Sequence, residues 1–355
     1  MPSIVIVAPG PLDARTGGYI YNRRIAESLE RRGWVVDTIE LDASFPCPTA
    51  AALQHAGRAL AAIRDETITL IDSLALGAMP ELITREAPRL TIVALVHQPL
   101  AAAIGFDAVT RARLEDGERH AVRMAALVVV TGRAALPFIE KYDVPRDRVV
   151  VVEPGTDRPD VLRSIRQSGD VELLCTGTVN QGKGHEMLLE ALASVRDMPW
   201  RLTCAGSLMR DPVTVRRVRE TAMRLRLENR VSFVGDLDAQ ALEACYSRAD
   251  VFVLATHQET YGMAVAEAVA HGLPVIATKT GAIPELVGDD AGVLVPVGDA
   301  AALVEALARV LRDTDLRVRL SKGARLRRNQ LPTWDEASSQ MADALNRLCR
   351  ANADG

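Results

Sequence analysis

Residues 171–205 read VELLCTGTVNQGKGHEMLLEALASVRDMPWRLTCA. The apolar runs Val171–Thr176 and Arg201–Ala205 predict two buried strands, and the Ala- and Leu-rich run His185–Arg196 between them predicts a helix. Strands that alternate with helices indicate a parallel sheet covered on both faces. The glycine-rich loop around Lys183 follows the first strand, at the edge where open α/β sheets bind ligands.

The same alternation continues on both sides of this stretch. Before it, we expect strands at Ile4–Ala8, Val35–Leu41, Thr69–Asp72, Leu90–His97, Leu127–Thr131 and Val149–Glu153, with helices at Gly18–Arg32, Ala50–Asp65, Leu82–Arg85 and Arg111–Ala125. After it, we expect strands at Val231–Val234, Val251–Ala255, Val275–Ala277 and Val293–Val295, with helices at Val213–Leu225, Gln240–Arg248, Gly262–Ala270 and Ala300–Asp313. Two such series predict an α/β protein with two Rossmann-like domains that face a cleft.

A stiff segment separates the two series. Residues 153–159 read EPGTDRP, with two prolines and one glycine, which is typical of a linker. We therefore expect a first domain at residues 1–157 and a second at 158–331. The amphipathic segment Trp334–Arg350 follows Pro332, so residues 332–355 are expected to form a helix that packs back on the first domain.

Composition excludes several classes of protein. With 355 residues, 48% hydrophobic and 25% charged, the chain has the composition of a globular protein and the length of two domains. The net charge of −4 argues against a nucleic-acid binder. Five cysteines without a C-x-x-C motif argue against a disulfide framework or a zinc site, and favour a reducing compartment.

The chain start and the basic segment bear on location. Met-Pro-Ser followed by a strand lacks the features of a signal peptide, and no apolar run approaches the ~20 residues of a spanning helix. The expectation is a cytoplasmic protein. Arg309–Arg328 is rich in Arg and Lys, which allows peripheral membrane contact, although a solvated helix face is the favoured interpretation.

Two glycine-rich loops could hold phosphate. Gly17 and Gly18 open a helix after the first strand, where free N–H groups favour an anion; a simple tight turn is an equally good interpretation. Gly177 and Gly184 enclose the loop that carries Lys183, which could neutralise a diphosphate as a mobile charge. The spacing is not that of a Walker loop, and a solvated loop lysine is the alternative.

Glu259 and Glu267 lie on either side of a predicted helix start. Eight helical residues span on the order of 12 Å, whereas paired glycosidase carboxylates lie roughly 5–9.5 Å apart. The two glutamates therefore fit better as contacts to opposite ends of one elongated ligand, whose anionic middle meets the helix N-terminus. A surface helix with two solvated glutamates is the alternative.

These motifs resemble a known family. Thr176–Leu192 is similar to the donor loop of retaining glycosyltransferases of family 4, the glycosyl transferases group 1. Arg248–Val287 resembles that family's most specific block, with ADVFV at 249–253, the two glutamates, GLPVIA at 272–277 and Gly281 through Pro284-Glu285. Gly17-Gly18 and the turn EPGTD at 153–157 also match. The resemblance covers about residues 4–330 and is generic in the N-terminal half.

The resemblance implies a GT-B fold and the transfer of a hexose-type sugar from a nucleotide-sugar, UDP- or GDP-linked, with retention of configuration. It implies no separate cofactor and no metal; the acceptor (small molecule, glycan or lipid) stays open. Implied catalytic residues are His97, Lys183 and Glu259. Implied donor-binding residues are Gly17, Gly18, Thr178, Lys183, Glu259, Gly262, Met263, Ala264 and Glu267. Without the resemblance, His97 is a strand-end histidine that caps a loop.

One departure from the family pattern concerns catalysis. Thr178 stands where the family commonly has an arginine, and a hydroxyl cannot replace a guanidinium fork. Arg210 and Lys279 are possible substitutes. The departure keeps open a non-catalytic nucleotide-sugar-binding partner protein, and a GT-B-type sugar-nucleotide epimerase is a further alternative. A dehydrogenase is a weaker one, since no G-x-G-x-x-G motif follows a strand.

Overall fold

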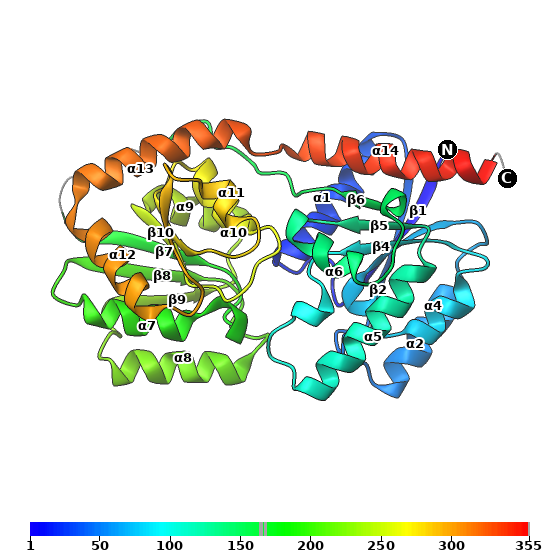
Figure 1. Ribbon diagram of the computed structural model, residues 1–355, viewed down its shortest axis with the longest axis horizontal. Helices are drawn as coiled ribbons and strands as arrows, with labels where there is room; N and C mark the ends of the chain where they lie inside the picture. The colour runs from blue at the N-terminus through cyan, green and yellow to red at the C-terminus, as the bar shows by residue number, and fades with distance from the viewer. Residues whose placement is uncertain (163–165, 167–168, 354–355) are drawn as a thin grey trace. The chain divides into compact units, whose positions relative to one another are not determined.

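The computed structural model describes residues 1–162, 166 and 169–353, which divide into two compact units. Unit 1 comprises Met1–Gly155 with Pro332–Gly355, and unit 2 comprises Thr156–Leu331. Each unit contains one six-stranded sheet, and all strand pairs that join within the two sheets are parallel (Figure 1). The expected architecture of two Rossmann-like domains is confirmed.

The sheet of unit 1 has the order β2-β1-β3-β4-β5-β6. Its strands are β1 (Ser3–Pro9), β2 (Val35–Leu41), β3 (Ile68–Asp72), β4 (Thr91–Val96), β5 (Leu127–Val130) and β6 (Val149–Val151). Strands β3 and β5 are buried throughout, whereas the edge strand β2 is largely exposed. Continuous apolar strands therefore mark the centre of the sheet, because helices cover both of its faces.

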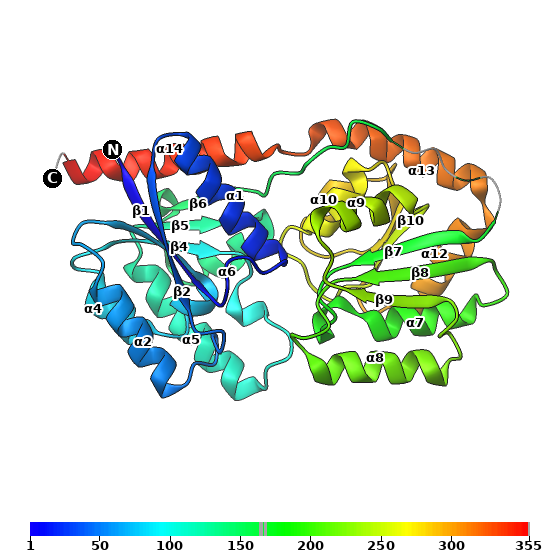
Figure 2. The ribbon, with the colours of Figure 1, turned by 180° about the vertical axis from the view of Figure 1, so that it is seen from behind.

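Helices cover the two faces of this sheet as two separate apolar clusters. The helices of unit 1 are α1 (Gly17–Arg31), α2 (Ala50–Ala61), α3 (Ser73–Leu76), α4 (Pro80–Glu86), α5 (Ala108–Met124), α6 (Leu136–Glu140) and α14 (Trp334–Ala353). The short helices α3 and α6 were not expected from the sequence. Helices α1 and α14 lie together (Figure 2), with Ile25 and Leu29 in one cluster with Met341 and Leu345.

Helix α14 confirms the expected return of the C-terminal segment to the first domain. Its start is a capping box, in which Thr333 N–H donates to Glu336 Oε2 (2.7 Å) and Glu336 N–H donates to Thr333 Oγ1 (3.2 Å). Gly155 of the linker lies against the Trp334 backbone, and a side chain on Gly155 would overlap it. The linker glycine is thus required by close packing.

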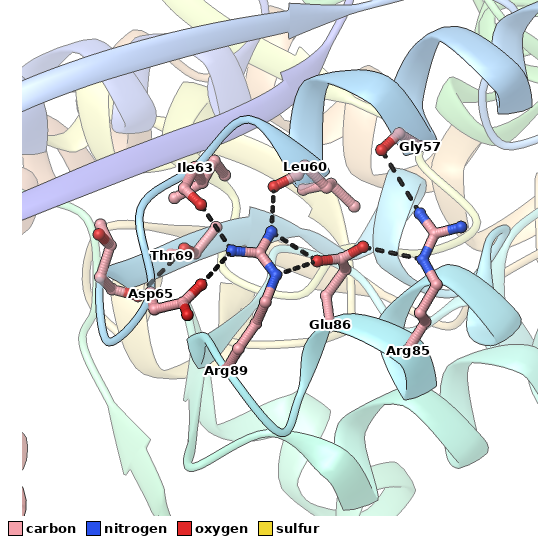
Figure 3. A network of polar contacts seen from close by, with 9 residues as sticks. Gly57, Leu60, Ile63, Asp65, Thr69, Arg85, Glu86 and Arg89 are labelled. Atoms are coloured by element: carbon pink, nitrogen blue, oxygen red, sulfur yellow. Dashed lines mark hydrogen bonds and ion pairs between the residues drawn. The ribbon is translucent and has the colours of Figure 1, made fainter.

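Helix α2 is shorter than the expected Ala50–Asp65 and ends at Ala61. The physical reason is Arg89, whose guanidinium donates to the carbonyl oxygens of Leu60 (2.7 Å) and Ile63 (2.6 Å) (Figure 3). These carbonyls lie where the helix stops, and basic side chains commonly satisfy such groups. The same guanidinium is held by two carboxylates, those of Asp65 and Glu86.

A buried carboxyl lies on helix α5. Glu118 is fully buried, and its Oε2 accepts hydrogen bonds from the Leu100 N–H (2.9 Å) and the Tyr142 hydroxyl (3.0 Å). Within the described part of the chain its Oε1 has no partner. Burial raises the pKa of Glu118 to about 8.

We predict that Glu118 makes unit 1 less stable as the pH rises. A pKa raised from 4.5 to about 8 means that the native state keeps a proton that the unfolded chain has lost. Its stabilising effect is complete below pH 4.5 and is lost as the pH rises to about 8, in total on the order of 5 kcal/mol. The amide side chain that Glu118→Gln introduces stays neutral at every pH. When the pH is raised from 5 to 9, the melting temperature of this variant should therefore fall less than that of wild type. Equal pH dependence of the two proteins would contradict the prediction.

The sheet of unit 2 has the order β12-β11-β10-β7-β8-β9. Its strands are β7 (Val171–Thr176), β8 (Trp200–Ala205), β9 (Val231–Gly235), β10 (Val251–Leu254), β11 (Val275–Thr278) and β12 (Gly292–Val295). The chain first builds outward from β7 to β9 and then restarts with β10 on the other side of β7. The strand order therefore reverses between β7 and β10, where open α/β sheets bind ligands.

The helices of unit 2 are α7 (His185–Ser194), α8 (Pro212–Arg224), α9 (Ala239–Arg248), α10 (Met263–Ala270), α11 (Ile283–Val287), α12 (Ala300–Arg312) and α13 (Thr314–Arg327). Helix α11 was not among the expected elements, whereas α13 lies in the basic segment that was interpreted as a helix face. The basic segment 309–328 is not a single solvated face. Asp313 divides it into two helices, and Arg317 is buried, donating to the carbonyls of Val310 and Leu311 (both 2.8 Å).

Candidate active site

The loops after β7 and β10 meet because their strands are neighbours and run in the same direction. The loop after β7 carries Lys183, and the loop after β10 carries Glu259. Gly182 O accepts hydrogen bonds from the His257 N–H (2.8 Å) and the Thr256 hydroxyl (3.0 Å), which join the two loops. The topology alone thus brings together two residues 76 positions apart.

Lys183 and Glu259 form an ion pair through Nζ and Oε1. Their side chains are 24% and 13% exposed, so the alternative of a solvated lysine and a solvated glutamate is wrong for both. Lys183 ends a 3-10 turn (Gln181–Lys183), and the side chain of the residue before this turn, Asn180, accepts the Lys183 N–H (3.1 Å). The ammonium group is therefore held at the C-terminal edge of the sheet.

The start of helix α10 provides the free N–H groups that the sequence predicted. Gly262 has φ +95°, a left-handed conformation that favours glycine, and it precedes the first helical residue, Met263. The N–H groups of Met263 and Ala264 belong to the first turn, which has no earlier carbonyl within the helix to receive them. This helix start carries a partial positive charge that suits an anion.

Glu267 lies one turn further along α10 and is half-buried. Its Oε2 accepts the Tyr246 hydroxyl (2.7 Å), and Tyr246 is buried on α9. Burial raises the pKa of Glu267, and the Tyr246 hydrogen bond partly offsets this effect. Glu259 and Glu267 therefore have separate partners, and the alternative of two solvated glutamates is wrong for Glu267 as well.

Thr178 lies half-buried in the β7 loop. Of its two possible substitutes, Arg210 is exposed and precedes Asp211, whose carboxylate accepts the Gln181 N–H from the turn that carries Lys183. Lys279 is also exposed, and it lines a cavity of about 680 Å³ together with residues of β12, α12 and α13. Arg210 is thus on the segment that contacts the Lys183 turn.

In unit 1, the predicted residues Gly18 and His97 are in contact. A side chain on Gly18 would lie 3.1 Å from His97 Cδ2, so the glycine lets the first turn of α1 approach the imidazole closely without crowding it. His97 Nε2 lies 3.0 Å from Asn22 Oδ1 and 3.6 Å from Asp72 Oδ2. Gly17, the first residue of α1, precedes this contact.

The hydrogen bonds around His97 define its proton. Asn22 Nδ2 donates to Asp72 Oδ2 (3.5 Å), which leaves Asn22 Oδ1 to accept from His97 Nε2–H. Burial lowers the pKa of His97, with the Asp72 charge opposing. The ring is therefore neutral at pH 7, and its Nδ1 is left as a hydrogen-bond acceptor.

Sequence reasoning missed four residues that support the predicted ones, namely Asn22, Asp72, Thr176 and Tyr246. The sequence does contain a signal for Asp72. Asp72 is the last residue of β3 and His97 directly follows β4, and the C-terminal ends of neighbouring parallel strands lie at the same edge of a sheet. Tyr246 had none, because a tyrosine within a helix is usually a core residue.

The five cysteines of the chain are dispersed and form no disulfide. Cys175, Cys204 and Cys245 are buried, whereas Cys47 is exposed and Cys349 half-buried; all five are free. Among the described residues, no cluster of three or more His, Cys, Asp or Glu could hold a metal ion. Within the same residues, no helix combines the length and apolarity that a membrane span requires.

Comparison with known proteins relates the larger part of unit 2 to a family. Residues 161–327 match the family described as glycosyl transferases group 1. The chain is 30% identical over 263 residues to the D-inositol 3-phosphate glycosyltransferase of Saccharomonospora viridis, covering 68% of this chain and 60% of that protein. It is 30% identical over 244 residues to that of Xylanimonas cellulosilytica, covering 64% and 58%. The chain thus spans about three fifths of the length of these curated relatives.

Solved structures agree on the fold. Sucrose-phosphate synthase from Thermosynechococcus elongatus matches with a TM-score of 0.84 and 21% identity, over 99% of this chain and 100% of that one. Anabaena HepE in complex with UDP-glucose matches with a TM-score of 0.76 and 18% identity, over 98% and 100%. The chain therefore has the GT-B fold, and residues 161–327 of unit 2 match the glycosyl transferases group 1 family.

Proposed function

We propose that this protein transfers a hexose-type sugar from a nucleoside-diphosphate sugar to an acceptor hydroxyl, with retention of configuration. The observation that carries the proposal is the Lys183–Glu259 ion pair, close to the free helix start of α10 at the point where the strand order reverses. A cation and a helix N-terminus suit a diphosphate, and a carboxylate suits sugar hydroxyls. HepE, with the same fold, was solved with UDP-glucose.

In the proposed mechanism, the diphosphate takes the Lys183 ammonium from Glu259, whose carboxylate then accepts hydroxyls of the sugar. The N–H groups of Met263 and Ala264, with the turn at Gly262, contact the sugar or the phosphate. As the bond to the anomeric carbon breaks, Lys183 stabilises the charge that develops on the leaving diphosphate. The sugar passes through an oxocarbenium-like state, and the leaving phosphate accepts the proton of the incoming hydroxyl.

The remaining predicted contacts belong to the same proposal. Glu267 accepts hydrogen bonds from the ribose, and His97 Nδ1 accepts a sugar hydroxyl. Gly17 and Gly18 contact the phosphates. No cofactor beyond the nucleotide-sugar is proposed. Because the curated relatives are named for D-inositol 3-phosphate, that compound is the first acceptor to test.

A thermal-shift panel of UDP, GDP, ADP and their glucose conjugates tests donor binding first. A ligand that binds only the native state increases the free energy of unfolding, by about 2.7 kcal/mol when its concentration is a hundred times Kd. The melting temperature therefore rises. Consumption of the best donor is then followed with and without D-inositol 3-phosphate, and NMR of the product gives the anomeric configuration. If no nucleotide raises the melting temperature, the proposal is wrong.

Thr178 favours a second candidate, a nucleotide-sugar-binding protein that catalyses no transfer. One cation of the usual pair is missing at this position, and the missing charge would act mainly on the leaving group. If this candidate is right, nucleotides raise the melting temperature, but the donor is not consumed with any acceptor. The epimerase alternative predicts an altered nucleotide-sugar without an acceptor, which chromatography of the same reactions detects.

A further inference from the structure

The hydroxyl of Tyr246 lies at a junction between three elements of unit 2. It is 2.9 Å from Thr176 Oγ1 at the end of β7, 3.3 Å from Ala264 O in the first turn of α10, and 2.7 Å from Glu267 Oε2. Tyr246 itself is 2% exposed on α9. A single buried oxygen therefore contacts the strand that leads into the Lys183 loop and the helix that carries Glu267.

The number of available hydrogen atoms decides which group donates and which accepts in each hydrogen bond of this junction. A tyrosine hydroxyl has one hydrogen, and its shortest contact is to the Glu267 carboxylate, which can only accept when ionised. The Thr176 hydroxyl must then donate to the Tyr246 oxygen. The order is thus Thr176 to Tyr246 to Glu267, with every donor directed along the chain of bonds toward the carboxylate.

The Tyr246 ring packs against two other rings. It stacks on His271 with centroids 4.6 Å apart and planes at 17°, and on Phe252 at 6.3 Å and 19°. His271 is fixed in turn, because Nδ1 lies 2.7 Å from Glu267 O and Nε2 lies 2.8 Å from Glu243 Oε2. The ring cannot tilt without breaking these contacts, so its hydroxyl position is well defined.

The other oxygen of Glu267, Oε1, has no hydrogen-bond partner among the residues that the structure describes. Oε2 accepts from Tyr246, whereas Oε1 makes no hydrogen bond within the described residues and is not sealed from solvent. Rotation of the carboxylate about its Cγ–Cδ bond would move Oε2 away from the Tyr246 hydroxyl and break that hydrogen bond, so the bond favours one direction for Oε1. Oε1 is therefore presented in one orientation to any ligand at this end of the site.

We propose that Tyr246 is a positioning residue for ribose recognition, which orients Glu267 so that Oε1 accepts a ribose hydroxyl. This inference rests on the proposed function, because it requires a nucleotide in the site. Through Thr176, the same hydroxyl ties the ribose end of the site to the strand that leads into the Lys183 loop. Tyr246 touches neither substrate nor reacting atoms in this role.

The test is Tyr246→Phe, which removes the hydroxyl and keeps the stacked ring. Calorimetric titration with UDP, 2′-deoxy-UDP and 3′-deoxy-UDP, and with the GDP series, gives Kd for each ligand. Wild type should bind the ribonucleotide about tenfold more tightly than at least one deoxy form, the loss of one good hydrogen bond. In Tyr246→Phe, affinity for the ribonucleotide should fall about tenfold, while affinity for that deoxy form stays unchanged.

This selectivity separates positioning from a structural effect. A variant that merely loosened the fold would weaken all nucleotides equally, and that result would overturn the inference while the proposed function stands. Wild type that binds without distinguishing ribose from deoxyribose would overturn it too. If wild type binds no nucleotide, both the proposed function and the inference fail.

Two further variants complete the experiment. Tyr142→Phe removes an equally buried tyrosine hydroxyl in unit 1 and should leave nucleotide affinity unchanged. Thr176→Val removes the donor at the other end of the chain of bonds and should give a smaller, about threefold, loss confined to the ribonucleotide. It also tests the inference if Tyr246→Phe fails to fold, and an equal loss for ribo and deoxy forms would again overturn it.

Discussion

Lys183→Ala is expected to lower the rate of sugar transfer by on the order of 100- to 1,000-fold, with the fold retained. The effect of one electrostatic group on a developing charge is of this size. Lys183 is one of few lysines in the chain and is held by Glu259 at the C-terminal edge of the sheet. Thr178 cannot substitute for it, so little residual charge stabilisation remains. Release of UDP from UDP-glucose, with the best acceptor from the panel, measures the rate.

Glu259→Ala should abolish transfer, yet affect binding differently from Lys183→Ala. Its removal frees Lys183 for the diphosphate, so affinity for UDP should stay the same or increase. Affinity for UDP-glucose should fall relative to UDP, because the sugar loses its carboxylate partner. Lys183→Ala should instead weaken both ligands. Lys322→Ala, an exposed lysine on α13, is the matched control. Turnover like wild type in both site variants would exclude the proposed mechanism.

Gly184→Ala should destabilise unit 2 by about 3 kcal/mol or more and disrupt nucleotide binding. Gly184 has φ +66°, where a residue with a side chain costs roughly 1–2 kcal/mol. In addition, a methyl group at this position would overlap the Ala255 carbonyl oxygen at the end of β10. Neither the new methyl group nor the carbonyl oxygen can rotate away, since both are attached directly to the backbone. The loops that carry Lys183 and Glu259 must therefore move apart, at a further cost of roughly 1–3 kcal/mol.

Gly298→Ala is the control that isolates the overlap. Gly298 has φ +77°, and a side chain there would meet nothing within 4 Å. Its substitution should therefore cost only the conformational part, and the difference between the two variants in urea unfolding measures the overlap. Equal losses of stability would show that the two loops do not approach as closely as the structure indicates.

Sequence patterns were reliable for the sheets because the strands that form their centres are buried on both faces. Runs such as 127–130 and 251–254 are continuously apolar, a pattern typical of strands buried on both faces of a sheet. The end of helix α2 was wrong for the opposite reason. Residues 62–65 continue a helical pattern, but Arg89, distant in sequence, takes the carbonyls at the helix end.

The sequence also indicated which residues to examine in the site, since Lys183, Glu259 and Glu267 follow strands or start a helix. It could not show that Lys183 pairs with Glu259, because that contact depends on the strand order. Strand order is set by which apolar faces pack together, and local patterns do not encode it. Nor could it show that the Tyr246 hydroxyl contacts Glu267. In the sequence, a buried tyrosine has the same pattern whether or not its hydroxyl has a role.

By itself, the sequence determined the class of the protein: two parallel α/β units, a glycine loop with one lysine, and two glutamates around a helix start. These features are local, because propensity, periodicity and loop chemistry act over a few residues. Only the tertiary structure decided which polar groups share protons, from the neutral His97 beside Asn22 to the junction at Tyr246. Such partners are chosen by the packing of elements far apart in the chain, and burial then sets their ionisation.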